Sequence, residues 1–193
     1  MTMQTKFDKS YYFGDVYDNY DQFLDFGKLA TELIVSYEFD SFLDIGCGCG
    51  NLVKEIKKQL ESKCKKDCDV RGIDISDFAV KRADASFIHL ADCTVLPFKD
   101  NQFDMVYILG TFAYLETEKA LLKAMREAYR VSRKGIVFED VYTVPDKKSD
   151  DYDPHRVQFR NQEDWSNLWK KILNKNDKVK FNKDEIFITK YEP

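Results

Sequence analysis

Residues 42–50 read FLDIGCGCG, and this stretch decides the fold. The apolar side chains of Phe42, Leu43 and Ile45 predict a short buried strand that stops at a glycine-rich turn. Residues 51–60 then carry apolar side chains at helical spacing. A strand that passes through a glycine turn into a helix is where a doubly wound sheet opens a crevice for a ligand.

The same order of strand and helix repeats along the chain, which predicts a parallel sheet with helices on both faces. We expect further strands over 70–75, 87–90, 103–109 and 135–142, and helices over 77–85, 118–131 and 162–173. An apolar face running from Tyr20 to Ile34 predicts a first helix. Strands at 179–181 and 186–188 flank a short turn, so we expect an antiparallel hairpin at the sheet edge. The predicted fold is a doubly wound, seven-stranded α/β sheet.

The length of 193 residues predicts one domain over 1–193. Within it we expect a helical lid and first helix over 1–40, a ligand-binding core over 41–142, and a substrate-side loop, helix and hairpin over 143–193. Hydrophobic residues at 44% and charged residues at 33% are typical of a globular protein, which disfavours disorder.

The net charge of −4 argues against a protein that mainly grips nucleic acid, because that affinity comes from clustered Lys and Arg. The sequence has no apolar stretch of about 18 residues that would span a membrane, and residues 1–10 have no apolar centre of the kind found in signal peptides. We therefore expect a cytoplasmic protein.

Five cysteines do not predict a disulfide framework under cytosolic conditions, which keep thiols reduced. A zinc site is the sharper alternative, but Cys47 and Cys49 lie within the glycine turn and Cys64 and Cys68 within a lysine-rich loop, and neither pair has C-x-x-C spacing. We expect packing or loop thiols and no metal.

Two acidic residues accompany the glycine turn. Asp44 precedes its first glycine and Asp74 ends the next strand, so one carboxylate can meet a ligand ammonium and the other can accept from both hydroxyls of a ribose. The alternative is that they only cap the helices that follow. Nicotinamide dinucleotides are disfavoured, because Asn51 stands where a third glycine is usual and Asp44 where an apolar residue is usual.

Four segments in register resemble the motifs of the class I S-adenosylmethionine-dependent methyltransferases. FLDIGCGCG resembles their first motif, GIDIS the second, and ADCTVLPFKDNQFDMVYI the third and fourth, while REAYRVSRKGIVFEDV is similar to the helix and fifth strand that follow. The usual Pro-Gly-Gly turn is here Arg133-Lys134-Gly135. The resemblance implies a Rossmann-like fold, S-adenosylmethionine as the cofactor and methyl transfer as the activity.

The resemblance also implies a role for individual residues. Asp44 and Gly46 would lie against the methionine moiety, Asp74 would hold the ribose, and Asp92 would accept from the adenine amino group, unless it is a plain loop acid. The full set of implied cofactor-binding residues is Tyr20, Asp44, Gly46, Cys47, Gly48, Gly50, Asp74, Ile75, Asp92, Cys93, Leu109 and Gly110.

Two segments are candidates for the acceptor side. Residues 11–20 are dense in aromatic side chains and form a lid over the cofactor or, alternatively, staple the first helix to the core. The wall after the fifth strand comprises Glu139, Asp140 and the run Asp153-Pro154-His155-Arg156. His155 is a candidate base, unless it is simply solvated. Tyr114 is a further catalytic candidate and Glu116 a pocket candidate, unless both belong to the first turn of the next helix.

The pattern favours transfer to an oxygen or nitrogen of a small metabolite, such as a sugar or natural-product intermediate. Signatures of nucleobase amino methylation, of catechol-type metal sites and of pyrimidine-attacking thiolates are missing from the sequence. The alternatives are a protein or RNA methyltransferase that works with a partner subunit, and a non-catalytic subunit that binds the cofactor. The oligomeric state is a separate question, for which the sequence allows a homodimer.

Overall fold

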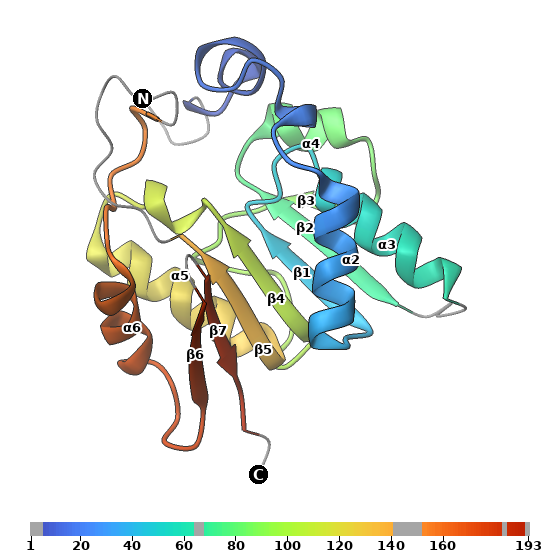
Figure 1. Cartoon of the computed structure of the whole chain (residues 1–193). Helices are drawn as coiled ribbons and strands as arrows, with labels where there is room; N and C mark the ends of the chain where they lie inside the picture. Colours follow the sequence, from blue (N-terminus) through green and yellow to red (C-terminus); the bar gives the residue numbers. More distant parts are fainter. Residues whose placement is uncertain (1–5, 64–67, 141–151, 183–184, 192–193) are drawn as a thin grey trace.

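The computed structural model describes residues 6–63, 68–140, 152–182 and 185–191. A seven-stranded sheet with the order β3-β2-β1-β4-β5-β7-β6 forms its centre (Figure 1). The strands are β1 (Ser41–Ile45), β2 (Asp69–Asp74), β3 (Ile88–Leu90), β4 (Phe103–Leu109), β5 (Ser132–Glu139), β6 (Lys178–Asn182) and β7 (Glu185–Thr189). The first five run parallel and β7 runs antiparallel to both β5 and β6. The predicted fold and edge hairpin are therefore confirmed.

Helices cover the two faces of the sheet (Figure 1). One apolar cluster joins β1, β4 and β5 to α5 and α6, and a second joins the other face of the sheet to α2 and α3. Every residue of β1 is buried, as expected for a parallel strand covered on both sides. The helices are α2 (Phe26–Tyr37), α3 (Asn51–Ser62), α4 (Asp77–Ala83), α5 (Glu118–Val131) and α6 (Gln162–Lys170), with short turns η1 (Tyr11–Asp15), η2 (Tyr20–Gln22) and η3 (Phe112–Tyr114).

The single helical face expected from Tyr20 to Ile34 is wrong at its start. The chain forms the short turn η2 there, and α2 begins only at Phe26, because the Asp25 side chain accepts a hydrogen bond from the backbone N–H of Lys28 and caps the helix. Apolar spacing continues across this break, so the spacing alone did not reveal it.

The fifth strand, expected over 135–142, starts earlier than predicted, because β5 begins at Ser132 and runs through residues 133–135. Arg133 donates to the buried carboxylate of Asp104 on the neighbouring strand, and Gly135 pairs with Met105 after a shift in register. The side-chain pair across the two strands therefore extends β5 beyond its apolar run.

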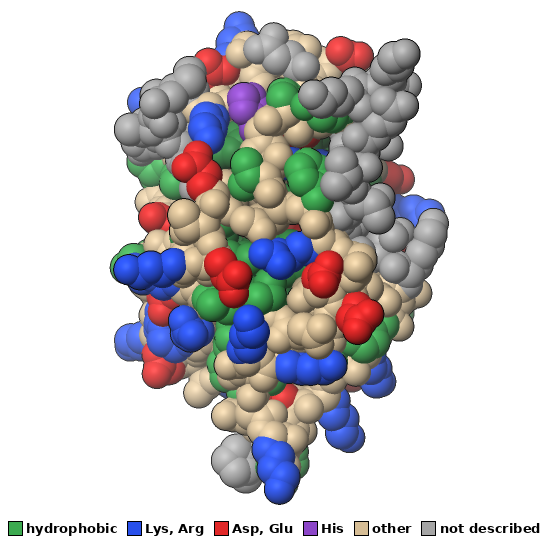
Figure 2. Space-filling model, turned by 90° about the vertical axis from the view of Figure 1, so that its left-hand side faces the viewer, with side chains coloured by type: hydrophobic (Ala, Val, Ile, Leu, Met, Phe, Trp, Pro, Cys, Tyr) green, Lys and Arg blue, Asp and Glu red, His purple; other side chains and the backbone are tan. Residues whose placement is uncertain are grey.

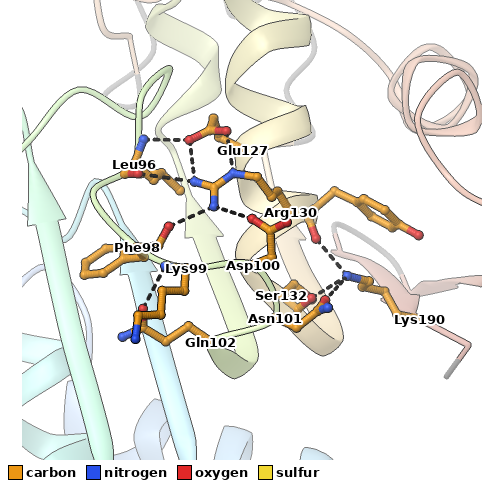
Figure 3. Close-up of polar contacts among 11 residues, drawn as sticks. Leu96, Phe98, Lys99, Asp100, Asn101, Gln102, Glu127, Arg130, Ser132 and Lys190 are labelled. Atoms are coloured by element: carbon orange, nitrogen blue, oxygen red, sulfur yellow. Dashed lines mark hydrogen bonds and ion pairs between the residues drawn. The ribbon is translucent and has the colours of Figure 1, made fainter.

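Polar contacts fasten the amino ends of β4 and β5 to the end of α5 (Figure 3). The Arg130 guanidinium donates to the carboxylates of Glu127 and Asp100 and to backbone carbonyls before β4. The Lys190 ammonium donates to the carbonyls of Tyr129 and Ser132, which lie where α5 ends and β5 begins. These contacts lie at the edge of the sheet opposite to the glycine turn, so they stabilise the fold without entering the predicted site.

Candidate active site

The loop after β1 is held in a shape that requires glycine. Gly46 and Gly48 have φ angles of +80° and +54°, which side chains other than glycine rarely adopt. A Cβ at Gly46 would lie 2.6 Å from Cγ2 of Thr111, and one at Gly48 would overlap the Tyr20 phenol ring. The N–H groups of residues 46 and 47 both donate to the Ile73 carbonyl. The loop backbone is therefore approached closely by the side chains of Thr111 and Tyr20.

Asp74 ends β2 with both carboxylate oxygens engaged. Oδ2 accepts from the N–H of Gly48 and Oδ1 from that of Ser76, each at 2.8 Å. Burial raises the pKa of this carboxyl, and hydrogen bonds from backbone N–H groups, those of Ser76 and Gly48 among them, oppose the rise. The Asp74 carboxylate therefore faces the backbone of the glycine loop and holds it in place through its hydrogen bond with Gly48.

Asp44 lies on the neighbouring strand with its side chain buried. Burial, together with the negative charge of Asp74, raises the pKa of Asp44 to about 8. Its carboxyl group makes no hydrogen bond with any part of the chain that the structure describes. Two neighbouring buried carboxyls with one left unpaired form a site that fits a cationic group.

Residues 7–20, here called the aromatic cap, lie over this loop (Figure 1). Tyr12 packs edge-on against Tyr20 with ring centroids 4.9 Å apart and stacks on Phe78 at 5.9 Å. Burial raises the pKa of both tyrosines, so their hydroxyls keep their protons near neutral pH. The aromatic cap is therefore a packed layer of rings beside the glycine loop, and its role as a lid stays a prediction.

A second polar group lies under the cap, next to the loop after β4. The Tyr114 hydroxyl donates to Oδ2 of Asp153 at 2.6 Å, the Tyr11 hydroxyl donates to the same oxygen at 3.1 Å, and the two hydroxyl oxygens are 2.7 Å apart. The His155 ring lies 5.9 Å from the Tyr11 ring and 6.4 Å from that of Phe7, measured between centroids. Both predicted catalytic residues thus lie in this group.

Most residues predicted to bind the cofactor lie along the carboxyl edge of β1, β2 and β4. Cys47 is buried against Gly72, and Gly50 caps the start of α3 with a φ of +75°. Ile75 packs against the aromatic cap. Leu109 and Gly110 are half-buried at the end of β4, where the N–H of Gly110 faces the Glu139 carbonyl at 3.4 Å.

Asp92 and Cys93 follow β3. The side chain of Asp92 is exposed and accepts from the N–H of Thr94 at 2.8 Å, so it shapes its own turn. Burial and the charge of Asp92 raise the pKa of Cys93 to about 12, which keeps this thiol protonated. Glu116, the other pocket candidate, is exposed and pairs with Lys6 at 2.6 Å.

Asp140, a candidate for the acceptor side, is hydrogen-bonded to neighbouring parts of the chain. It is fully buried, Oδ2 accepts from the N–H of Phe112 at 2.6 Å, and its backbone carbonyl accepts from Nε1 of Trp165. Burial raises the pKa of Asp140 to about 7. This carboxyl therefore holds the turn that carries Tyr114.

Thr111 is a site residue that sequence reasoning missed. Its hydroxyl donates to the Ile45 carbonyl at 2.9 Å, which ties the loop after β4 to the end of β1 directly beside Gly46. Its position directly after Gly110, the residue that follows β4, is the only signal in the sequence, and that signal is weak.

Within residues 6–63, 68–140, 152–182 and 185–191, no three His, Cys, Asp or Glu side chains form a cluster that would hold a metal ion. The four described cysteines are free thiols. Across the same residues no helix has both the length and the apolar character that crossing a membrane requires.

Comparison with known proteins gives consistent matches. A family model described as a methyltransferase domain matches residues 42–135. The chain is 27% identical over 173 residues to a phosphoethanolamine N-methyltransferase of Triticum aestivum, covering 74% of this chain and 33% of that protein. It is 25% identical over 116 residues to a sterol 4-C-methyltransferase of Caenorhabditis elegans, covering 58% of this chain and 32% of the relative. The chain thus spans about a third of the length of these curated relatives.

The fold matches solved structures at low sequence identity. DesVI of Streptomyces venezuelae superimposes with a TM-score of 0.69 at 16% identity, covering 91% of this chain and 97% of that one. At this identity the likeness concerns the fold, and it extends over nearly the whole length of both chains.

Proposed function

Because this chain belongs to the class I S-adenosylmethionine-dependent methyltransferases, we propose that it transfers a methyl group to an oxygen or nitrogen of a small metabolite, such as a sugar or natural-product intermediate. The observation that carries this proposal is the pair of buried carboxyls, Asp44 and Asp74, on either side of a glycine loop. The two curated relatives are named for methylation of phosphoethanolamine and of a sterol, so both act on small molecules.

The residues present fit S-adenosylmethionine by their chemistry. Asp44, buried without a hydrogen bond to the described chain, would pair with the ammonium of the methionine moiety. Asp74 would accept from the ribose hydroxyls while keeping its bonds to the loop. Gly46 and Gly48 would let the ligand lie directly against the loop backbone. Ile75 and Cys93 would border the adenine, with Asp92 beside its amino group.

The bound cofactor supplies a methyl group activated by a positive sulfur, so the protein's task is alignment and the exclusion of water. Leu109 and Gly110 would face the sulfonium. The faces of Tyr12 and Tyr20 would stabilise its positive charge, a contribution of about 0.5–2 kcal/mol for such contacts. The aromatic cap would keep water from the reacting atoms.

On the acceptor side, His155 and Tyr114 would have different roles. Burial raises the pKa of Tyr114 well above its ordinary value, so its hydroxyl stays protonated. Because that proton is donated to Asp153, the Tyr114 oxygen would orient the acceptor by accepting a hydrogen bond from it. His155 carries an imidazole, whose ring nitrogen would take the proton that an acceptor hydroxyl or ammonium loses.

Recognition of a nucleic acid is disfavoured. The face in Figure 2, which looks onto the α6 side, has Lys and Arg interspersed with Asp and Glu rather than gathered in one basic patch. The alternatives of a partner-dependent protein methyltransferase and of a non-catalytic subunit would both predict cofactor binding without turnover of small acceptors. We also propose that the protein works in the cytoplasm, where thiols such as Cys47 and Cys49 stay reduced.

A screen for S-adenosylhomocysteine release tests the proposal. The purified protein is incubated with S-adenosylmethionine and pools of small amines, hydroxy acids, sugars and phosphorylated amino alcohols. We expect release with at least one pool and loss of that release in Asp44→Asn. Binding of the cofactor with no release from any pool would contradict small-molecule methylation and favour the non-catalytic or partner-dependent alternatives.

A further inference from the structure

Three segments that are far apart in the sequence meet at the carboxyl group of Asp153. They are the aromatic cap through Tyr11, the η3 turn through Tyr114, and the loop before α6 that carries Asp153 itself. The Asp153 side chain is only 3% exposed. Burying a carboxylate without hydrogen-bond donors costs free energy, so the buried position of Asp153 depends on these contacts.

Both oxygens of Asp153 are occupied by donors. Oδ2 accepts from the hydroxyls of Tyr11 and Tyr114, and Oδ1 accepts from the backbone N–H of His155 at 2.8 Å. Hydrogen bonds to a charged acceptor are about twice as strong as those between neutral groups. The Tyr11 hydroxyl therefore contacts the Asp153 carboxylate directly, and it also contacts the Tyr114 hydroxyl that this carboxylate holds.

The loop of Asp153 is fixed from its other side, independently of the cap. The N–H groups of Val157 and Gln158 both donate to the Ala113 carbonyl, at 2.8 and 2.9 Å, and Nε2 of Gln158 donates to the Leu115 carbonyl at 2.7 Å. The loop and the η3 turn thus form one bonded unit. The cap is a separate part, which this unit contacts through the Tyr11 hydroxyl and also through the rings of Phe7 and Tyr17.

The cap has to move for a ligand to reach the glycine loop, because the Tyr20 ring lies where a Cβ of Gly48 would be. Other polar anchors at the cap include the Phe7 carbonyl, which accepts from the hydroxyl of Ser76, and the exposed ion pair between Lys6 and Glu116. Exposed ion pairs contribute little. The hydrogen bond from Tyr11 to Asp153 therefore ties the closed aromatic cap to the loop on the acceptor side.

We propose that Asp153 is a positioning residue, which latches the aromatic cap over the cofactor loop through Tyr11 while it fixes the Tyr114 hydroxyl at the acceptor side. The contribution to ligand retention rests on the proposed function, whereas the latch itself does not. The Asp153 carboxylate would then control two things, which are closure of the aromatic cap and binding of the acceptor beside the hydroxyls of Tyr11 and Tyr114.

The test is hydrogen–deuterium exchange of residues 7–20 in the ligand-free protein, compared between wild type and Asp153→Asn. An amide offers one acceptor oxygen and a donor where the carboxylate has two acceptors, so we expect exchange across the cap to become about tenfold faster. Tyr11→Phe, which removes only the hydroxyl, should have a similar effect, and the double variant should add little to either single one.

Asp177→Asn is the matched control. Asp177 also accepts from a tyrosine hydroxyl, that of Tyr129 at 2.7 Å, and from a backbone N–H, that of Asn174, but it lies away from the cap. We expect its exchange over residues 7–20 to equal that of wild type. Dissociation of S-adenosylhomocysteine, measured by stopped flow, should be about tenfold faster in Asp153→Asn and unchanged in Asp177→Asn.

The outcomes separate the latch from the proposed function. Unchanged cap exchange in both Asp153→Asn and Tyr11→Phe would overturn the latch. If Asp153→Asn unfolds the whole protein, the Tyr11→Phe variant provides the test. Faster exchange confined to residues 7–20 in Tyr11→Phe would support the latch, and exchange equal to that of wild type would refute it. Faster cap exchange in a protein that binds no S-adenosylhomocysteine would support the latch and contradict the methyltransferase proposal.

Discussion

The substitution Gly46→Ala tests whether the glycine loop is shaped by its backbone and by Thr111. Alanine at a φ of +80° costs about 1–2 kcal/mol, because its Cβ approaches the following carbonyl. The new Cβ would also lie 2.6 Å from Cγ2 and 2.9 Å from Cβ of Thr111, so that side chain has to shift. Loss of its hydrogen bond to the Ile45 carbonyl costs about 0.5–1.5 kcal/mol more. We expect a total loss of about 1.5–3.5 kcal/mol in the free energy of unfolding.

Gly27→Ala is the matched control for the same chemical change. Gly27 lies in the first turn of α2, and the nearest atom to a Cβ there would be Oδ1 of Asp25 at 3.6 Å, an ordinary contact. Alanine in a helix is favoured over glycine, so this variant should gain about 0.5–1 kcal/mol. Urea denaturation followed by circular dichroism measures both values from the shift in midpoint at constant slope. A Gly46→Ala protein within about 0.5 kcal/mol of wild type would refute the explanation, since the left-handed backbone conformation by itself predicts a larger loss.

Three further predictions concern charge, the far edge of the sheet and metal. The pKa of Asp44 is raised to about 8 in the folded chain, which therefore holds this proton more tightly than the unfolded chain does. The free energy of unfolding of the ligand-free protein should fall as the pH rises from about 4 to about 8. In Asp44→Asn, the urea midpoint should fall less over the same pH range. Lys190→Ala removes the donor to the Tyr129 and Ser132 carbonyls and should lower the unfolding free energy by about 1–2 kcal/mol in the same assay, while leaving S-adenosylhomocysteine affinity unchanged. Methyl transfer should persist in EDTA, and loss of turnover that magnesium or zinc restores would contradict the proposed metal-free chemistry.

Most of the fold could be predicted because its signals are local. Leu43 and Ile45 mark a buried strand, and the alternation of strands and helices sets the parallel order of the sheet. The break before α2 and the extension of β5 to Ser132 could not be predicted, because they depend on the cap at Asp25 and on a contact between strands. The pattern of apolar residues passes through both places without change.

The candidate site divides in the same way. The glycine loop and Asp74 could be predicted because the chain order alone brings them to one edge of the sheet. The convergence of Tyr11 and Tyr114 on Asp153 joins residues more than a hundred positions apart, and no spacing in the sequence encodes it. The chemistry of loop residues such as Tyr114 and His155 was enough to propose them as candidates. Their hydrogen-bond partners could be identified only in the folded structure.

The most direct test of the central claim is calorimetric titration of S-adenosylhomocysteine into wild type and Asp74→Ala. We predict saturable one-to-one binding by wild type and affinity about 5- to 150-fold weaker in the variant, because the ribose hydroxyls lose their acceptor at a cost of about 1–3 kcal/mol. Circular dichroism of both proteins confirms that the variant is folded. Wild-type affinity in a folded Asp74→Ala protein would remove Asp74 from the site, and binding of NAD with no response to S-adenosylhomocysteine would contradict the account as a whole.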